Sequence, residues 1–346
     1  MADRPTLKQL AERLQVSETT VSLILHDKGR FSESTRRRVL AEAATFGYRP
    51  NQAAQAMARG RFGSLALLMS AEGGNSRLFN GLLDGIEDAL EERRLHLLVA
   101  RLSDAQLVDR TSMPKLLTTV ASDGLLINYH VRIPDSMERL VAEFRLPSVW
   151  INTRRRMNAV YPDDHTNART ATEHLLRLGH RRIAYVNLNR APHLDEVEHY
   201  SFTDRRDGYL AAMAAAGCRP ILLGPEGSEE MPGPERIARV KAWLTGPDRP
   251  TAFLTYSEYA AYPLFTAAHA LGLSIPGEVS LVTFHDTIVR TFGPQFGTMI
   301  IPFREVGSEA VALVHQRIES DSRDLPARAI VGTFVPGDTV AAAPRG

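Results

Sequence analysis

Apolar residues near the N-terminus recur at the three- and four-residue spacing of amphipathic helices. The first such face consists of Leu7, Leu10, Ala11 and Leu14. The preceding segment, Thr6-Leu-Lys-Gln9, has the form of a capping box, and Ser17 and Ser32 are placed to cap a second and a third helix. Gly47 is the expected stop of the third helix. The pattern predicts two short helices joined by a tight turn and a third that completes their core, which is a helix-turn-helix unit.

From Gly63 onward, short apolar runs alternate with helical stretches. The expected buried strands are 65–69, 97–100, 124–127, 148–151, 183–186, 252–255 and 279–284. The expected helices are 79–93, 167–178, 205–216, 259–271 and 304–319. Alternation of this kind predicts α/β units built around parallel sheets.

The composition is that of a globular protein with room for more than one domain. The chain has 346 residues, of which 44% are apolar and 23% charged, and no stretch approaches the roughly 18 uninterrupted apolar residues of a membrane span. Cys218 is the only cysteine, so an intrachain disulfide and a cysteine-based zinc cage are excluded. The first residues contain no apolar signal core, and we therefore expect a cytoplasmic protein.

The net charge of +1 conceals an asymmetry along the chain. Residues 1–61 carry eleven Lys and Arg against six Asp and Glu, and the remaining residues carry 30 against 34. A small basic module ahead of a larger, mildly acidic body is typical of a nucleic-acid anchor on a globular domain. Basic residues that only solvate a surface are the alternative.

Common signatures of catalysis are missing from the sequence. It contains no GxxxxGK[ST], GxGxxG, HExxH or GxSxG motif. Asp163 and Asp164 are adjacent, so their side chains point in different directions. Several histidines could suggest a metal cluster, but their spacing matches no ligand pattern: His165, His174, His180, His193 and His199. We expect no enzyme activity, no cofactor and no metal.

Three N-terminal motifs resemble the lactose-repressor (LacI/GalR) family of transcriptional regulators. They are Thr6-Leu-Lys-Gln-Leu-Ala11, Val16-Ser-Glu-Thr-Thr-Val-Ser22 and Gly47-Tyr-Arg-Pro-Asn51, and further similarity lies in 173–184, 205–209, 271–280 and 284–286. The resemblance implies an N-terminal all-α helix-turn-helix plus a hinge helix. It also implies a periplasmic-binding-protein-like α/β effector domain, with two subdomains of parallel sheets and a ligand cleft between them.

The second helix is the expected reader of DNA. Its polar face carries short side chains that can reach base edges or phosphates, although a small three-helix bundle without this role is the alternative. Leu23 stands where many relatives carry arginine, and His26 where asparagine is usual, so the operator sequence cannot be copied from a relative. The expected DNA contacts are Thr6, Ser17, Glu18, Thr19, Thr20, Ser22, Leu23, His26, Asn51, Ala54, Gln55, Met57 and Arg59.

The segment from Asn51 to Ala58 matches the hinge helix of the family. Asn51 can cap it, and Met57 occupies the position of the leucine that relatives insert into the minor groove. Eight residues are too few for a stable isolated helix, so the resemblance implies that the segment folds only on DNA, between two subunits. A plain linker is the alternative.

The resemblance also nominates effector contacts one position at a time. They are Ser70, Arg77, Phe79, Asn152, Asp163, Arg205, Glu258 and His285. Arginine suits hydrogen bonding to sugar hydroxyls because its fork donates several fixed hydrogen bonds. Glu258 stands where Asn-Asp pairs are frequent, and His285 replaces a usual aspartate. The loss of that acceptor makes a sugar acid or phosphorylated sugar an alternative effector, whereas a surface or structural histidine is the plainer interpretation.

We expect a helix-turn-helix domain at 1–50, a hinge helix and linker at 51–61, and an effector-binding and dimerisation domain at 62–346. Its N-subdomain is expected at about 62–160 and 290–323, and its C-subdomain at about 161–289 and 324–346. The expected function is a sequence-specific regulator, a repressor controlled by a small carbohydrate-like effector. We expect it to act as a homodimer on palindromic operator DNA, cytoplasmic and nucleoid-associated, with no membrane partner. The alternatives are a sugar-processing enzyme fused to a DNA-binding head and an exported nutrient-binding protein.

Overall fold

The computed structural model describes most of the chain in two compact units, residues 1–63 and 64–346. The described residues are 5–25, 28–49, 61–72, 74–103, 122–131, 133–143, 145–188, 199–224, 233–290, 293–320 and 324–345. Each unit is considered by itself below.

The first unit contains the three expected helices, which are α1 (Leu7–Leu14), α2 (Glu18–Leu25) and α3 (Glu33–Phe46). The capping box is present at Thr6: the Gln9 amide donates to the Thr6 hydroxyl at 3.2 Å, and the Thr6 amide donates to the Gln9 side chain at 2.9 Å. Gly47 ends α3 in the left-handed conformation, with φ of 69°. The helices pack through a core centred on Leu10, Val21 and Val39, which are fully buried.

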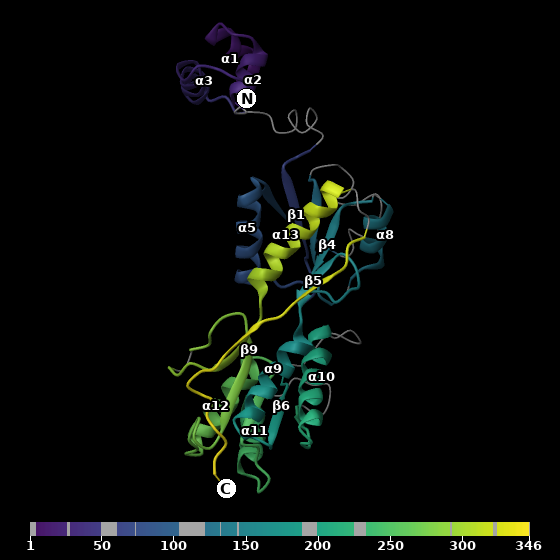
Figure 1. The fold of residues 1–346 in the computed structure, drawn as a ribbon, viewed down its shortest axis with the longest axis vertical. Helices are drawn as coiled ribbons and strands as arrows, with labels where there is room; N and C mark the ends of the chain where they lie inside the picture. The colour runs from purple at the N-terminus through teal and green to yellow at the C-terminus, as the bar shows by residue number, and fades with distance from the viewer. Residues whose placement is uncertain are drawn as a thin grey trace. The chain divides into compact units, whose positions relative to one another are not determined.

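The second unit is built on two six-stranded sheets, and the expected α/β architecture is confirmed (Figure 1). The first sheet has the order β11-β5-β4-β3-β1-β2, and the second has the order β12-β10-β9-β8-β6-β7. Among these strands, every described pairing is parallel except that of β10 with β12. The first sheet comprises β1 (Ser64–Ser70), β2 (His96–Leu102), β3 (Gly124–Asn128), β4 (Ser148–Ile151), β5 (Ala159–Pro162) and β11 (Arg328–Ile330). The second comprises β6 (Ile183–Val186), β7 (Ile221–Leu223), β8 (Ala252–Thr255), β9 (Ser280–His285), β10 (Gly297–Ile300) and β12 (Thr333–Val335).

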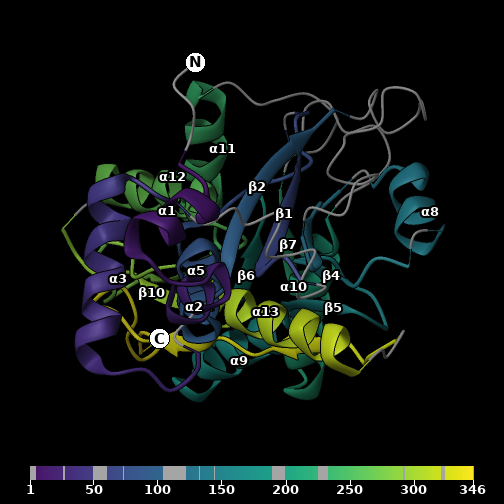
Figure 2. The same cartoon turned by 90° about the horizontal axis from the view of Figure 1, so that it is seen from above.

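Each sheet has its own helices, and we call a sheet with its helices a half. The first half holds α5 (Asn80–Arg93), α8 (Asp135–Glu143) and α13 (Phe303–Ser320). The second half holds α9 (Asp164–Arg177), α10 (Tyr200–Ala215), α11 (Gly233–Thr245) and α12 (Glu258–Ala270). Helices α5 and α13 pack side by side (Figure 2). Gly85 and Gly307 make this possible, because a β-carbon at Gly85 would collide with the carbonyl oxygen of Arg304.

In the described part of the chain, three segments cross between the halves, and two of these crossings differ from the expected boundaries. β10 was expected in the first half but pairs with β9 in the second, whereas β11 was expected in the second half but pairs with β5 in the first. The crossings therefore follow β10 and β11. The segments that follow β10 and β11 pass close to each other, because a β-carbon at Gly332 would collide with the carbonyl oxygen of Ile300.

Strand β2 also departs from expectation, because it is not buried. It is an edge strand of the first sheet, and Leu98 and Val99 are 40% and 56% exposed. Its apolar run predicted a strand correctly, but the run could not reveal that Leu98 and Val99 stay exposed among the described residues.

Candidate functional site

Helix α2 presents a polar face that its own core contacts leave outward. Val21 and Ile24 are buried against α1 and α3, which turns Glu18 and Thr19 to the exposed surface. Ser17 begins the helix: the Thr20 amide donates to the Ser17 hydroxyl at 3.1 Å, and the two hydroxyls lie 2.9 Å apart. Ser17 and Thr20 thus serve the helix start, whereas Glu18 and Thr19 are available for contact.

Contacts between α1 and α3 stabilise the core on which α2 packs. The Arg13 guanidinium on α1 donates to the Glu42 carboxylate on α3 at 2.8 Å and lies 4.7 Å from the centre of the Phe46 ring. Tyr48 packs against the same core, and burial together with the nearby Glu18 charge raises its pKa. Ser22 and Leu23 are half-buried. His26, Asn51, Ala54, Gln55, Met57 and Arg59 lie outside the described residues, so their assigned contacts stay predictions.

In the second unit, several nominated residues lie at the carboxyl ends of strands. Ser70 ends β1, Asn152 follows β4, and His285 ends β9. In parallel sheets such ends meet at one edge, where ligands of α/β proteins bind. The Ser70 hydroxyl is already engaged, because it donates to the Glu72 carboxylate at 3.0 Å, and the Ser70 amide donates to the Ser76 hydroxyl at 2.8 Å.

Arg205 is the most buried cation of this region. Its Nε donates to Asp164 Oδ1 at 2.7 Å and its Nη1 donates to the carbonyl oxygen of Tyr256 at 2.7 Å. The guanidinium also lies 4.3 Å from the centre of the Phe284 ring and 4.6 Å from that of Tyr256. Burial raises the pKa of Asp164 and the Arg205 charge opposes that rise, while Asp164 holds the pKa of Arg205 above its ordinary value.

Asp163, the nominated carboxylate, is used as a helix cap. Its Oδ1 accepts from the Thr166 amide at 3.0 Å and its Oδ2 accepts from the Thr166 hydroxyl at 2.8 Å. The next residue, Asp164, points to Arg205 instead. Sequence reasoning missed this partner, although the adjacency of the two aspartates showed that they face different ways.

A chain of polar groups links the two halves near Asn152. The His199 Nε2 lies 2.9 Å from the carbonyl oxygen of Asn152, and the His199 Nδ1 lies 2.8 Å from the Ser201 hydroxyl. The Tyr256 hydroxyl is 2.7 Å from Ser201 Oγ. On the other side, His130 Nδ1 is 3.5 Å from the Asn152 side-chain nitrogen. Sequence reasoning nominated only Asn152 from this hydrogen-bond chain, because its members are far apart in sequence.

The two imidazoles in this chain are held neutral. Burial lowers the pKa of His130 to about 3, with further lowering from the charges of His199 and Arg77. Burial also lowers the pKa of His199 to about 4, although its hydrogen bond to the carbonyl oxygen of Asn152 opposes this. Neutral imidazole has one donor and one acceptor nitrogen, so both rings can join a directional hydrogen-bond chain.

Arg77 and Phe79 lie on the loop that leads into α5. The Phe79 ring stacks on Phe303 at 3.9 Å between centroids, and the Arg77 guanidinium lies 4.9 Å above Phe79. The Asn128 side chain, at the end of β3, donates to the carbonyl oxygen of Arg77 at 3.2 Å. The loop is thereby fixed against β3, and the exposed Arg77 side chain is held by an aromatic ring.

His285 and Glu258 bring opposite charges from the second half. His285 Nδ1 lies 3.0 Å from Asp286 Oδ1, and this contact raises the pKa of His285. The half-buried Glu258 adds to that rise, and the Arg77 charge contributes to lowering the pKa of Asp286. Arg77, Glu258, His285 and Asp286 therefore influence one another electrostatically across the halves.

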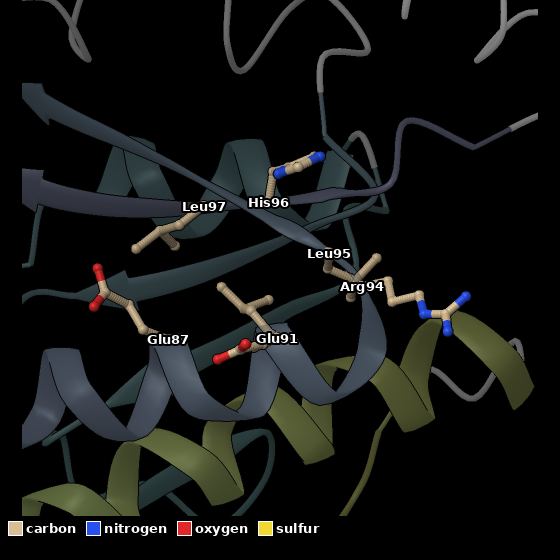
Figure 3. A pocket seen from close by; sticks show the side chains of 7 residues that line it. Glu87, Glu91, Arg94, Leu95, His96 and Leu97 are labelled. Carbon is tan, nitrogen blue, oxygen red and sulfur yellow. The ribbon is translucent and has the colours of Figure 1, made fainter. Parts of the chain in front are cut away.

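An open hollow of about 620 Å³ lies elsewhere, between α5 and β2 (Figure 3). Its lining is mixed, with Glu87 and Glu91 on the helix and Arg94 and His96 after it. It shares no residue with the nominated effector contacts.

Among the described residues, no group of three His, Cys, Asp or Glu side chains could hold a metal ion. No described helix is both long and apolar enough to cross a membrane.

Comparison with known proteins finds a match for each of the two units. Residues 6–51 match bacterial regulatory proteins of the lacI family, and residues 172–340 match the periplasmic binding protein-like domain. The HTH-type transcriptional regulator AglR of Rhizobium meliloti is 31% identical over 298 residues, covering 84% of this chain and 80% of AglR. The lac repressor dimer bound to operator and an anti-inducer has the same fold, with a TM-score of 0.76, 21% identity and coverage of 98% and 100%. The regulator CelR in complex with cellobiose has a TM-score of 0.61, 21% identity and coverage of 97% and 100%.

Proposed function

Because the chain belongs to the LacI family and is a DNA-binding transcriptional regulator, we propose that it represses transcription from a palindromic operator as a homodimer controlled by a carbohydrate-like effector. The family places it among regulators rather than enzymes, which sets aside the sugar-processing alternative. It acts in the cytoplasm, at the nucleoid.

The single observation that carries DNA binding is the outward polar face of α2. A capped helix whose apolar side is fixed by α1 and α3 can enter the major groove as a rigid body, with Glu18 and Thr19 toward the bases. The excess of positive charge in residues 1–61 favours the phosphate backbone. Met57, in the hinge segment, is assigned the minor-groove wedge.

The effector site is assigned to the strand ends where Asn152, Arg205 and His285 lie. The described hydrogen bonds of Arg205 use Nε and Nη1, so Nη2 is the group that we assign to an effector hydroxyl. Stacking between Tyr256 and Phe284 fixes the plane of the guanidinium before any ligand arrives. A preorganised donor of this kind suits a polyhydroxylated ligand.

A neutral sugar fits the charges better than an anion. Arg205 is already neutralised by Asp164, and His130 and His199 carry no charge at neutral pH. A sugar acid would depend on Arg77 and His285, each of which has a carboxylate within electrostatic reach. Titration calorimetry with glucose, cellobiose, gluconate and glucose 6-phosphate separates the two classes, since binding of only the last two would overturn the neutral assignment.

The homodimer is assigned to the α5–β2 edge, which we define as Glu87, Glu91, Arg94, His96, Leu98 and Val99. Leu98 and Val99 are exposed on the edge strand. Beside this strand, Glu87 and Glu91 lie on the helix and Arg94 and His96 follow it (Figure 3). Such a surface is complementary to a second copy of itself, because a two-fold axis can place the acids of one copy against the bases of the other.

Selection of bound DNA from a random pool, at stated salt and followed by sequencing, tests this function. We expect an enriched palindrome whose centre is a flexible pyrimidine–purine step. Repeating the selection with each candidate sugar shows whether an effector weakens or strengthens binding. A pool without enrichment under all these conditions would contradict the proposal.

A further inference from the structure

The first residues of helix α10 make hydrogen bonds and ring contacts with the first half. Besides the His199 contact, the Tyr200 hydroxyl donates to the Pro162 carbonyl oxygen at 3.2 Å and lies 3.3 Å from Asn152 Oδ1. The Tyr200 ring meets the Tyr161 ring edge-on at 5.6 Å, and Asp204 pairs with Arg154. The start of α10 in the second half thus contacts the end of β5 and the residues that follow β4 in the first half.

The hydrogen-bond partners fix the tautomer of His199 and favour one tautomer of His130. A carbonyl oxygen only accepts, so His199 Nε2 carries the proton and its Nδ1 accepts from the Ser201 hydroxyl, which in turn accepts from Tyr256. His130 Nε2 lies 2.7 Å from Asn128 Oδ1 and 3.5 Å from the Arg77 amide nitrogen, and the shorter contact favours the tautomer in which Nε2 donates to Asn128 and Nδ1 accepts from Asn152. The chain runs from Tyr256 in the second half to Asn128 in the first.

The two rings come from opposite halves and lie 5.7 Å apart between centroids. We propose that His130 and His199 form a proton-sensitive clasp, which holds the two halves together while both imidazoles are neutral and releases them when the imidazoles take up protons.

The cause is electrostatic and directional. A second proton on His199 would place a donor at Nδ1, where the Ser201 hydroxyl now donates. It would also bring a positive charge close to His130 and to Arg205 on the same helix. The titratable groups that face His130 are His199 and Arg77, and a positive charge on either one disfavours its protonation. Arg154 and Asp204 neutralise one another nearby. Separation of the halves returns both rings to water.

The direction of the pH effect follows from linkage. The clasped pKa values, about 3 and about 4, lie below the ordinary value of 6.5 that each ring regains in water. The clasp is therefore at full strength above pH 6.5 and weakens as the pH falls below it. Between pH 7.5 and 5.5, each histidine lowers the clasping equilibrium about tenfold, and the two together about a hundredfold.

An effector that binds between the halves would favour the clasped arrangement and so bind less tightly in acid; this consequence rests on the proposed function. The clasp itself does not, because it is tested on the full chain without effector. The measurement is hydrogen–deuterium exchange at pH 7.5 and 5.5, corrected for intrinsic rates and followed in peptides spanning 150–162 and 199–206.

In the wild-type protein, we expect protection of these two peptides to fall about a hundredfold between the two pH values, while peptides within β1 and β9 keep theirs. His199→Gln should leave about a tenfold fall, and the double variant His130→Asn/His199→Gln none. Ser201→Ala provides an independent test, because it removes a hydroxyl from the hydrogen-bond chain between His199 and Tyr256 without removing a titrating group. It should lower protection at both pH values and leave the ratio unchanged.

The matched control is His269→Gln, an exposed histidine near the end of α12. It should behave as the wild type. An equal fall in protection throughout the unit, or an undiminished fall in the double variant, would overturn the clasp. Either result leaves operator selection unaffected, so failure of the clasp and failure of the proposed function are distinguishable.

Discussion

Arg205 and Asp164 form an ion pair in which the guanidinium Nε lies 2.7 Å from the carboxylate Oδ1, and neither side chain is more than 7% exposed. The pair joins α10 to the beginning of α9 and holds the guanidinium between Tyr256 and Phe284. Buried ion pairs are costly to break from one side, since the remaining charge loses both its partner and water. The stability of the second half therefore depends on a group that we also assign to effector binding.

Removal of Asp164 is the first test of this dependence. We expect Asp164→Ala to lower the free energy of unfolding by about 3–5 kcal/mol, measured by urea denaturation at pH 7. The adjacent Asp163→Ala is the matched control, because it removes only a helix cap, at a cost of about 1 kcal/mol. Equal losses for the two variants would contradict the assigned roles.

The close contact between α5 and α13 leads to a second prediction, on the stability of a variant at Gly85. Gly85→Ala inserts a methyl group against the backbone of Arg304 and forces the helices apart, so we expect a loss of about 1–3 kcal/mol in the free energy of unfolding. Gly246→Ala serves as the control, since the nearest atom to its added carbon is 3.8 Å away. Thermal unfolding followed by circular dichroism compares the two variants, and an unchanged midpoint for Gly85→Ala would refute close packing.

Thr19 tests the assignment of α2 to base recognition. Its side chain is exposed, so Thr19→Ala should leave stability unchanged while reducing discrimination between the selected operator and single-base variants by on the order of 1 kcal/mol. Fluorescence anisotropy at fixed salt measures this, with Thr45→Ala on α3 as the control. Equal weakening on every sequence would point to a phosphate contact only.

The hinge prediction rests on Met57. Met57→Gly should reduce operator affinity at least about tenfold, because the wedge that holds the central base step open is lost. The affinity for effector, measured by calorimetry on the same preparation, should stay nearly constant. A gel-shift assay that finds operator binding unaltered would remove the hinge assignment.

The α5–β2 edge is tested by a charge placed in its apolar part. Val99→Asp should convert the homodimer to monomer in analytical ultracentrifugation at micromolar concentration, because two buried carboxylates would face one another across the axis. Val331→Asp is the control, since Val331 is similarly exposed, at 52% against 56%, on a different part of the unit. A dimer that survives Val99→Asp would place the interface elsewhere.

Local patterns in the sequence were enough for much of the fold. The capping residues Thr6, Ser17 and Ser32 and the stop at Gly47 identified the three N-terminal helices, because capping acts within a few residues. Apolar runs likewise located strands of both sheets, since burial on two faces requires them. The family motifs then indicated DNA binding, and the relatives support that function.

The tertiary structure alone decided which side chains meet. Asp164 rather than Asp163 pairs with Arg205, and His130 lies beside His199. β10 and β11 each lie in the half opposite to the one expected. These outcomes depend on where strands separated by many residues are brought into register, and no short-range pattern encodes that. The burial that holds both imidazoles neutral is of the same kind, because it comes from elements of both halves packed around one point.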